Sequence, residues 1–308
     1  MAIDRINWDN LRLFLAVVRA QSAQEAARRM EVDHSTITRR LHRLEKELGA
    51  QLFERTPAGH LLTTAGQRLL EHVERMESSM VLVGEDIGGD SHMLTGHVRL
   101  GATEGFGSFF LAPHLSHFCD RHPGIQVELL IVPRFINLSQ READLAVNIE
   151  RPQRSGQVSS KLTDYRLRLY ASRSYLQGRP PIRQLQDLAA HRFFGYVEEL
   201  VFSQELRYLT SIMPGAPMSL RSTSVVAQYN AVREGRGLAV LPCFMAAQCA
   251  DLEPVLPHEV DVLRTFWLAA PADRRELARV RALWDYLREL VERNQPFLLG
   301  DAPGWQRV

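Results

Sequence analysis

The sequence of 308 residues has few cysteines, almost no lysine and no long uncharged apolar run. Its three cysteines, Cys119, Cys243 and Cys249, include no C-x-x-C pair, which indicates free thiols in a reducing compartment rather than a disulfide framework or a redox switch. Lys46 and Lys161 stand beside abundant arginine, a composition typical of a GC-rich bacterial genome. Without a long apolar run or the apolar core of a signal peptide, we expect a cytoplasmic protein without a membrane span.

Signatures of catalysis and of metal binding are missing as well. The sequence has no H-E-x-x-H, no paired Cys/His spacing, no G-x-S-x-G elbow and no P-loop. The glycines Gly101, Gly105 and Gly107 lack dinucleotide spacing and an acidic partner about twenty residues further on. We therefore predict no enzyme, no cofactor and no metal site. Two alternatives stay open: a cytoplasmic α/β enzyme with an accessory helical domain and, disfavoured by the missing export signal, a transport solute-binding protein.

The length suggests two or three domains, and 45% hydrophobic residues is typical of a soluble globular protein. A net charge of +1 does not indicate nucleic-acid binding, so local charge has to decide. Near the start, apolar residues spaced i, i+3, i+4 and i+7 over 11–18 predict a helix capped by Asp9 or Asn10. A second helix begins at Ser22, which with Glu25 completes an S-x-x-E capping box.

A third helix is predicted from a cap at Asp33 to about Leu48, where Gly49 ends it. Its apolar stripe leaves hydrogen-bonding and cationic side chains on the opposite face. Two helices joined by a tight turn, the second with such a face, describe a helix-turn-helix, whose second helix enters the major groove. A solvated helix face is the alternative. The residues of this helix predicted to contact DNA are Ser35, Thr36, Thr38, Arg39, Arg40 and Arg43.

The following segment favours the DNA-binding interpretation. Residues 51–55 and 59–62 are expected to pair as a hairpin, which directly after a recognition helix is a wing. Arg55 and His60 at its tip are predicted to reach phosphates or the minor groove. Within the helix, we expect Arg39 at a guanine or a phosphate, whereas its neighbouring arginines neutralise phosphates without reading sequence.

A long helix is predicted after Thr63-Thr64, ending near Ile87. Its apolar residues alternate by four and three, which is a heptad seam. Such a stripe could pack on its own domain, but little of the chain remains nearby to cover it. We therefore expect the seam to pair two subunits. The residues predicted for dimerisation are Leu69, Val73, Met76, Met80, Val83 and Ile87.

These segments resemble the DNA-binding domain of LysR-type transcriptional regulators. The resemblance runs without a gap from about Trp8 to Gly66, and it rests on the stretches 11–18, 26–30, 43–45, 48–49, 52–55 and 62–66. Asp33-His34 and Thr38 are mild departures, because the family often has Ser-Gln and Ser there. The resemblance implies a dimerising linker helix, a tetramer built from two dimers, and an effector domain of two Rossmann-like lobes that looks like a periplasmic binding protein.

From His92 onward, short apolar runs alternate with helical patterns, which indicates an α/β domain with a largely parallel sheet. Crossings between lobes are expected near 163–165 and 264–265. The expected fold is thus an all-α winged helix-turn-helix with a long linker helix, followed by a two-lobed α/β effector domain. The predicted domains are the winged helix-turn-helix 1–66, the linker helix 67–90 and the effector domain 91–308, with lobe I at about 91–164 and 265–295 and lobe II at about 165–264.

Ligands of such sheets bind past the carboxyl ends of the strands, where loops and helix N-termini supply donors. Residues at these places, together with one aromatic wall residue, are the predicted effector site: Thr103, Glu104, Arg134, Asn148, Phe202, Thr223, Ser224 and Pro242. Arg134 could pair with a carboxylate and Glu104 could attract an amine, so a carboxylate or an amino acid is the expected effector. The sequence therefore predicts an effector-controlled, sequence-specific transcriptional regulator. Its expected partners are double-stranded DNA, a small molecule, copies of itself and RNA polymerase, and no membrane.

Overall fold

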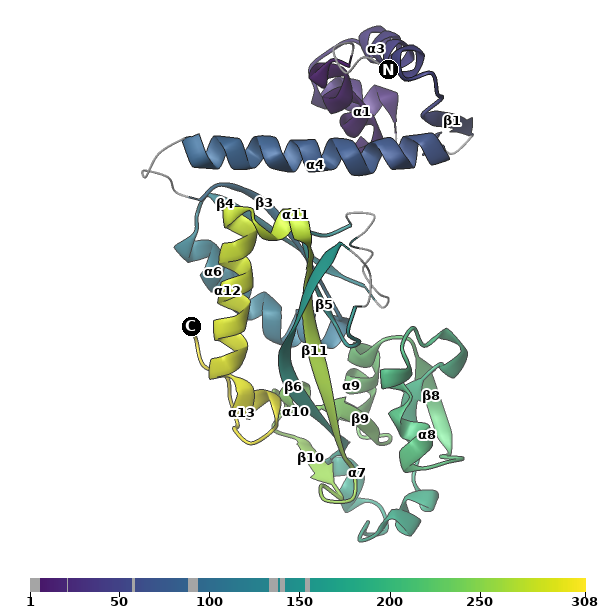
Figure 1. Cartoon of the computed structure of the whole chain (residues 1–308). Helices are drawn as coiled ribbons and strands as arrows, with labels where there is room; N and C mark the ends of the chain where they lie inside the picture. Colours follow the sequence, from purple (N-terminus) through teal and green to yellow (C-terminus); the bar gives the residue numbers. More distant parts are fainter. Residues whose placement is uncertain are drawn as a thin grey trace. The chain divides into compact units, whose positions relative to one another are not determined.

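The computed structural model describes residues 6–20, 22–56, 59–87, 94–132, 138, 142–152 and 156–308. The chain divides into two compact units, Met1–Gly89 and Asp90–Val308, which are described separately below (Figure 1). None of the helices in these described ranges is long and apolar enough to cross a membrane.

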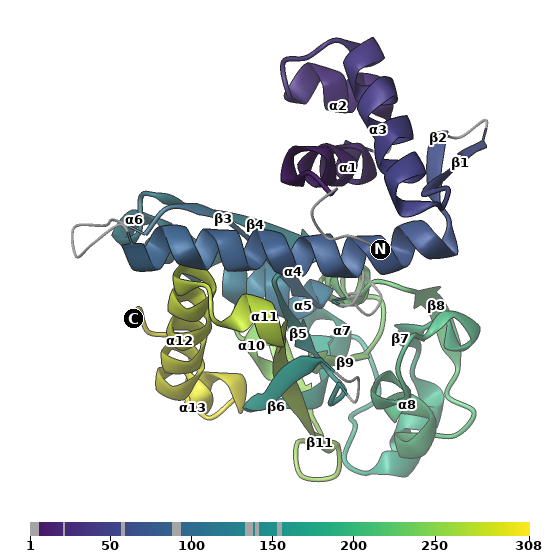
Figure 2. The ribbon, with the colours of Figure 1, turned by 45° about the horizontal axis from the view of Figure 1, so that its top comes forward.

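The first unit, over its described residues, consists of four helices and a two-stranded hairpin (Figure 2). In the hairpin the strands are antiparallel, and Phe53 pairs with Leu62 and Arg55 with His60. The predicted helix-turn-helix, wing and long helix are therefore present. The elements are α1 (Trp8–Ala20), α2 (Ala23–Arg29), α3 (His34–Leu48), β1 (Phe53–Thr56), β2 (Gly59–Leu62) and α4 (Thr64–Ile87).

The ends of α1 and α3 show how local chemistry sets the helix boundaries. The Asn7 side-chain oxygen accepts a hydrogen bond from the Asp9 amide at 2.7 Å, and α1 begins at Trp8. The expected cap at Asp9 or Asn10 is therefore wrong, because the acceptor is Asn7, two residues before Asp9. Helix α3 ends as predicted at Gly49, whose φ of 68° suits a residue without a Cβ.

The predicted capping box of α2 forms only in part. The Ser22 hydroxyl accepts a hydrogen bond from the Glu25 amide at 3.4 Å, as expected. The Glu25 carboxylate instead accepts hydrogen bonds from Arg28 at 3.0 Å and Arg29 at 2.9 Å. Two guanidinium groups one turn along the helix offer charge-assisted bonds, which are stronger than a bond to a backbone amide.

A hydrophobic core holds the first unit together. Phe14, Ile37 and Leu44 are fully buried, and the rings of Phe14 and Phe53 lie 5.4 Å apart, which joins α1 to the wing. Arg19 of α1 also donates two hydrogen bonds, of 3.0 and 2.6 Å, to the carboxylate of Glu77 in α4. These contacts fix α3 on a rigid support, so that its outward face is presented in one orientation.

The apolar stripe of α4 is buried in its own unit at the beginning of the helix and exposed further along. Val73 is 1% exposed and belongs to the core of its own unit, and Leu69 packs against that core. Val73 is therefore not a surface residue, and its assignment to a dimer seam is wrong. Met76, Met80 and Val83 are exposed, whereas the side chain of Ile87 lies outside the described residues. A heptad pattern is the same whether its first turns pack on their own domain or on another chain, so the sequence could not separate the two.

Gly66 is a position where the usual effect of a glycine-to-alanine change in a helix should reverse. An added Cβ would lie 2.2 Å from the backbone oxygen of Leu52 and 2.8 Å from Leu62. We expect Gly66→Ala to destabilise the first unit by about 1–3 kcal/mol through overpacking, although alanine favours helix. Chemical denaturation of the protein measures this. Gly304→Ala is the control, because a Cβ there meets no atom within 4 Å; equal stability of both variants would contradict the prediction.

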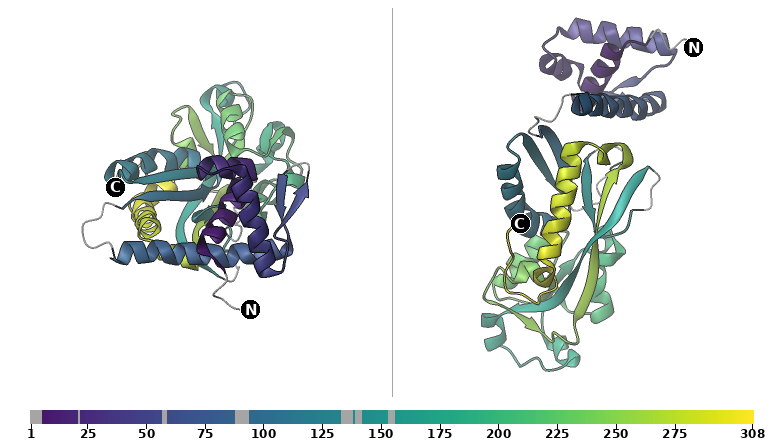
Figure 3. Two further views of the ribbon diagram at one scale, coloured as in Figure 1. Left: turned by 90° about the horizontal axis from the view of Figure 1, so that it is seen from above. Right: turned by 60° about the vertical axis from the view of Figure 1, so that its left-hand side comes forward.

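The second unit contains a seven-stranded sheet and a separate two-stranded sheet in its described part (Figure 3). The strands are β3 (Gly96–Ala102), β4 (Ile125–Ile131), β5 (Leu145–Asn148), β6 (Gln157–Ser172), β7 (Phe193–Tyr196), β8 (Met218–Ser222), β9 (Ala239–Pro242), β10 (Leu252–Val255) and β11 (Asp261–Pro271). The helices are α5 (Glu104–Phe106), α6 (Ala112–Arg121), α7 (Arg173–Gln177), α8 (Tyr208–Ile212), α9 (Val225–Arg233), α10 (Cys243–Ala246), α11 (Ala272–Arg275), α12 (Ala278–Arg293) and α13 (Gln295–Leu298), with a π-helical turn η2 (Gly107–Leu111) and 3-10 turns η4 (Leu185–Ala190), η5 (Glu198–Leu200) and η6 (Gln204–Leu206).

We call the part built on β3, β4 and β5 the first lobe and the part built on β7, β8 and β9 the second lobe. Two long strands, β6 and β11, run through both (Figure 1). The C-terminal part of β11 pairs with β5, and the C-terminal part of β6 pairs with β9. The two long strands also pair with each other, with Thr265 opposite Asp164 and a register shift after Phe266. The expected crossings thus lie within continuous strands.

The expectation of a largely parallel sheet holds only at the two ends of the unit. Strand β3 is parallel to β4 and β5, and β7 is parallel to β8. The other strand pairs, all of which involve β6 or β11, are antiparallel. The sequence shows β6 and β11 only through the apolar runs 167–171 and 266–270 in their second halves. The first half of each strand is largely polar or mixed, so the pattern indicates neither how long the strands are nor that they pair antiparallel.

The C-terminal segment packs back on the end of α12 through a polar contact and on α6 through an aromatic one. The side-chain oxygen of Asn294 accepts a hydrogen bond from the Gln306 amide at 2.6 Å, and Trp305 contacts the ring of His114 edge-on at 4.4 Å. His114 is fully buried, and neither of its ring nitrogens has a hydrogen-bond partner among the described residues. Burial, followed by the charges of His117 and Arg307, lowers the pKa of His114 from 6.5 to about 4.

This histidine should make the second unit sensitive to mild acid. Because the unfolded chain binds the proton more readily, stability is full above pH 6.5 and falls as the pH drops toward 4, on the order of 1 kcal/mol per pH unit. We expect His114→Phe to flatten this slope in thermal unfolding measured from pH 7 to 4.5. His258→Gln, at an exposed histidine, is the control; an unchanged slope in the His114 variant would contradict the assignment.

Candidate DNA-binding and effector sites

Helix α3 turns a polar and basic face outward because its apolar residues are used in the core. Ile37 and Leu44 are fully buried on one side, Ser35 and Arg39 are exposed on the opposite side, and Arg40 is exposed at the flank beside the buried stripe. The guanidinium groups of Arg39 and Arg40 make no hydrogen bond or ion pair with any described residue. They are therefore available to bond with an added partner.

The other residues predicted to contact DNA differ in their exposure and in the partners that they already have within the protein. Thr36 and Thr38 are half-buried, and the Thr38 hydroxyl donates to the His34 carbonyl at 3.1 Å. Arg43 is exposed but pairs with Glu47 at 2.7 Å, so it would have to exchange that carboxylate for a phosphate. Arg55 and His60 face each other across the hairpin by register, and their side chains lie outside the described residues. The face thus presents Ser35, Arg39 and Arg40 most directly.

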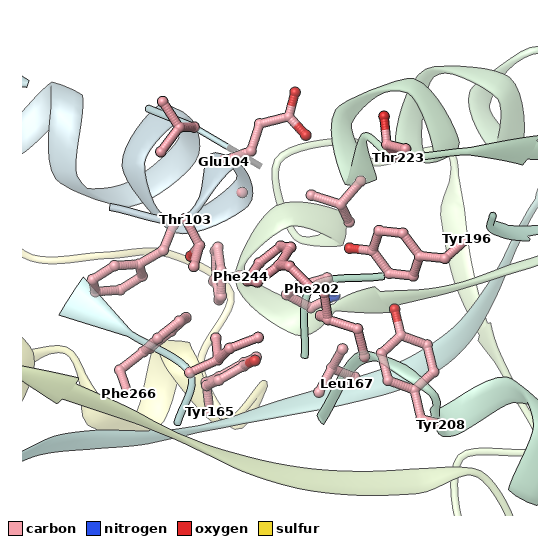
Figure 4. Close-up of a pocket in the computed structure, with 17 residues that line it drawn as sticks. Thr103, Glu104, Tyr165, Leu167, Tyr196, Phe202, Tyr208, Thr223, Phe244 and Phe266 are labelled. Carbon is pink, nitrogen blue, oxygen red and sulfur yellow. The ribbon is translucent and has the colours of Figure 1, made fainter. Parts of the chain in front are cut away.

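The second unit contains a cavity that opens to solvent, and its empty space together with the solvent at its mouth is about 530 Å³. It is lined from the first lobe, the two long strands and the second lobe (Figure 4). The lining residues are Thr103, Glu104, Gly105, Phe106, Val132, Ile149, Tyr165, Leu167, Tyr196, Phe202, Leu206, Tyr208, Thr223, Val225, Pro242, Phe244 and Phe266.

Most of the residues predicted for an effector site lie at this cavity. Those that line it are Thr103, Glu104, Phe202, Thr223 and Pro242. Ser224 is not among the lining residues, but its hydroxyl bonds to one of them, Glu104. Asn148 is buried and pairs with Trp267 between β5 and β11, and it is not among the lining residues, although the next residue, Ile149, is one of them. Arg134 lies outside the described residues.

Sequence reasoning missed most of the aromatic wall. Phe266 stacks on Tyr165 with ring centroids 4.0 Å apart and on Phe106 at 4.1 Å, while Phe244 and Tyr208 complete the wall. These residues lie in apolar stretches of strands and short helices, where aromatic residues are usually core. No pattern in the sequence distinguishes a ring that lines a cavity from one that fills a core.

The polar groups at the cavity are hydroxyls and a carboxylate. Burial raises the pKa of Tyr165, Tyr196 and Tyr208, so their hydroxyls stay protonated at any physiological pH. The hydroxyls of Tyr196 and Tyr208 bond to each other. Glu104 is the ionisable carboxylate of the described lining, and Figure 4 shows it pointing toward the helix that follows Thr223.

The three cysteines are free thiols, as expected. Cys243 is buried, and this burial raises its pKa, which makes the reactive thiolate scarcer.

Two family profiles match the chain, one for each unit. Residues 8–67 match the bacterial regulatory helix-turn-helix protein, lysR family, and residues 91–292 match the LysR substrate binding domain. Together they cover most of the sequence.

Individual proteins show the same relationship over nearly the whole length. The HTH-type transcriptional regulator PtxR of Pseudomonas aeruginosa is 30% identical over 308 residues, 97% of each chain. The Mau operon transcriptional activator of Paracoccus denitrificans is 27% identical, over 96% of this chain and all of that protein.

Solved structures share the fold at lower identity. Full-length OxyR from Pseudomonas aeruginosa, as a variant, superposes with a TM-score of 0.72 at 18% identity, covering 92% of this chain and 95% of that one. LysG from Corynebacterium glutamicum with bound effector Arg gives 0.63 at 20% identity, covering 92% and 99%. The winged helix-turn-helix, the two-lobed α/β unit and these matches over both units agree with the regulator prediction and give no support to the enzyme alternative. The chain therefore belongs to the LysR family of bacterial transcriptional regulators.

Proposed function

We propose that the exposed face of α3 recognises the operator of this regulator. The observation that carries the proposal concerns the guanidinium groups of Arg39 and Arg40, on a helix fixed by its own core: they have no partner among the residues that the structure describes. The guanidinium of Arg39 would contact a base edge, and Arg40 and Arg43 would contact phosphates. Ser35, Thr36 and Thr38 would add bonds to bases or phosphates, and Arg55 and His60 of the wing would reach the neighbouring backbone or the minor groove.

We propose that the linker helix α4 pairs two copies of the chain. Met76, Met80 and Val83 are 45%, 57% and 50% exposed, and they follow each other at the spacing of a coiled-coil seam. A seam of this kind would place two recognition helices on neighbouring half-sites. Two such dimers would form the tetramer.

We propose that this cavity binds the effector and that occupancy changes how the lobes are arranged. The hinge would lie where β6 and β11 cross between lobes, near 164–165 and 264–265. There the Thr265 hydroxyl donates to Asp164 at 2.6 Å. A change in lobe arrangement would alter the spacing of DNA-binding pairs and, through it, contact with RNA polymerase. A regulator of this kind acts on the chromosome, so we place it in the cytoplasm.

The proposal is tested by fluorescence anisotropy with the duplex that lies upstream of the protein's own coding sequence. We expect tight binding that prefers this duplex over a shuffled one and that weakens steeply with salt, because phosphate contacts release counterions. Equal binding to both duplexes at every salt concentration would refute sequence-specific recognition.

A further inference from the structure

The carboxylate of Glu104 bridges the two lobes at the edge of the cavity. It belongs to α5 of the first lobe, and one oxygen accepts the Ser224 hydroxyl at 2.8 Å. The other oxygen accepts the Val226 amide at 3.5 Å. Ser224 in turn accepts the Ala227 amide at 3.0 Å, so the hydroxyl proton is free to point at Glu104. Each oxygen of this carboxylate is thus engaged by the start of α9.

The first turn of a helix is where a ligand carboxylate would normally bind, since its unpaired amides and the helix dipole favour an anion. In this chain a carboxylate of the protein occupies that place. An anionic effector would have to displace Glu104 from its donors and would also be repelled by its charge. A second carboxylate between the lobes, Glu150, accepts a hydrogen bond from Ser203, beside the lining residue Phe202.

The rest of the described lining suits a ring rather than a charge. It contains seven aromatic residues, and none of its residues is Lys, Arg or His. Phe266 stacks on both Phe106 and Tyr165, so these ring faces cover one another, and an aromatic ligand would gain edge contacts with the apolar stack. The protonated tyrosine hydroxyls can bond to a polar uncharged group.

We propose that the effector is a small aromatic molecule without a carboxylate, because Glu104 of the first lobe already fills the anion-binding start of α9. The inference rests on the proposed function, in which this cavity is the effector site. It replaces the carboxylate or amino acid expected from the sequence. The amine that Glu104 was expected to attract remains compatible, because a cation is not repelled.

The test uses four probes that share a phenyl ring and a two-carbon chain and differ mainly in charge: 2-phenylethanol, 2-phenylethylamine, phenylalanine and 3-phenylpropionate. Calorimetric titration of the full chain should show the alcohol or the amine binding at least tenfold more tightly than the two carboxylates. A preference for phenylalanine or 3-phenylpropionate, whether or not Arg134→Gln abolishes it, would overturn the proposal. Failure of all four to bind would overturn it as well.

Two variants connect the selectivity to Glu104. Glu104→Ala uncovers the start of α9, and Glu104→Gln keeps the size of the side chain while removing its charge. We expect the preference against 3-phenylpropionate to shrink at least tenfold in the first and less in the second. Glu289→Gln removes an exposed carboxylate of α12 that pairs with Arg293, and it should change nothing. An unchanged preference in both Glu104 variants would overturn the proposal.

Operator binding measured in the same samples distinguishes a failure of the aromatic-effector inference from a failure of the proposed function. If no probe binds while operator binding is intact, the aromatic-effector inference fails and the DNA-binding proposal stands. If the probes bind in the cavity, as judged by their loss in Tyr208→Ala, but leave operator affinity and footprint unchanged, the cavity is not the effector site. In that case the proposed function of the cavity fails, and the inference fails with it.

Discussion

Replacing Arg39 by alanine is expected to weaken binding to the specific operator by about 10- to 100-fold, equivalent to about 1–3 kcal/mol. The guanidinium is exposed on α3 and has no partner among the described residues, so nothing in the protein has to be broken before it bonds to DNA. Binding to shuffled DNA should fall much less, because a base contact contributes only at the right sequence. Anisotropy titrations on both duplexes at one salt concentration measure the two losses.

Arg43 and Arg293 provide the comparison. Arg43→Ala should weaken binding to both duplexes alike and reduce the salt slope by about one, as expected for a phosphate contact. The loss of affinity in this variant should also be smaller, because the guanidinium already pairs with Glu47 and must leave it to bind a phosphate. Arg293→Ala, at an exposed ion pair in the second unit, should leave DNA binding unchanged. If Arg39→Ala and Arg43→Ala reduced specific and shuffled binding equally, the distinction between base and phosphate contacts would be refuted.

Met80→Glu is expected to convert the proposed dimer into a monomer and to lower operator affinity by about 100-fold or more. Met80 is 57% exposed on α4, so a glutamate costs the single chain little. In a paired helix, the same glutamate would be buried in the apolar interface without a partner of opposite charge, which is strongly unfavourable. When one recognition helix of a dimer is bound, the second is held close to its half-site, which raises the affinity of the dimer. A monomer lacks this increase in affinity. Light scattering and anisotropy on the same sample give both readouts.

Met80→Leu is the matched control, because it changes shape slightly and keeps the side chain apolar. It should remain dimeric and bind the operator as the parent protein does. A Met80→Glu variant that stays dimeric at micromolar concentration, with unchanged operator affinity, would show that this surface does not pair two chains.

The first unit could be predicted from the sequence almost completely. Residues close together in the sequence decide where its helices begin, where they end and which side is buried. Ser22 caps one helix, Gly49 ends another, and the spacing of Ile37 and Leu44 marks the buried side. The errors were local as well, as with Asn7, which caps α1 in place of Asp9 or Asn10. The exposed face of α3 followed directly, because the side of a helix that lacks apolar residues has little reason to be buried.

The cavity could be predicted only in outline. Thr103 and Glu104 follow β3, and ligands of α/β folds bind at such strand ends, so position along the chain was enough to find them. Phe244, Phe266 and Tyr208 come from segments far apart in the sequence, and only the path of the chain decides whether such rings meet as a core or around a cavity. The same holds for Glu104: its place after a strand was visible, but its two bonds to the start of α9 depend on how the lobes face each other.

The sequence by itself determined the family, the order of the units and the outward polar side of α3, because periodicity, caps and turns are encoded in neighbouring residues. Only the tertiary structure decided that Val73 is core while Met80 is exposed, that β6 and β11 pair antiparallel through both lobes, and that Glu104 bonds to the start of α9. Those outcomes depend on contacts between residues distant in the chain. A local pattern carries no information about which distant partner it will meet.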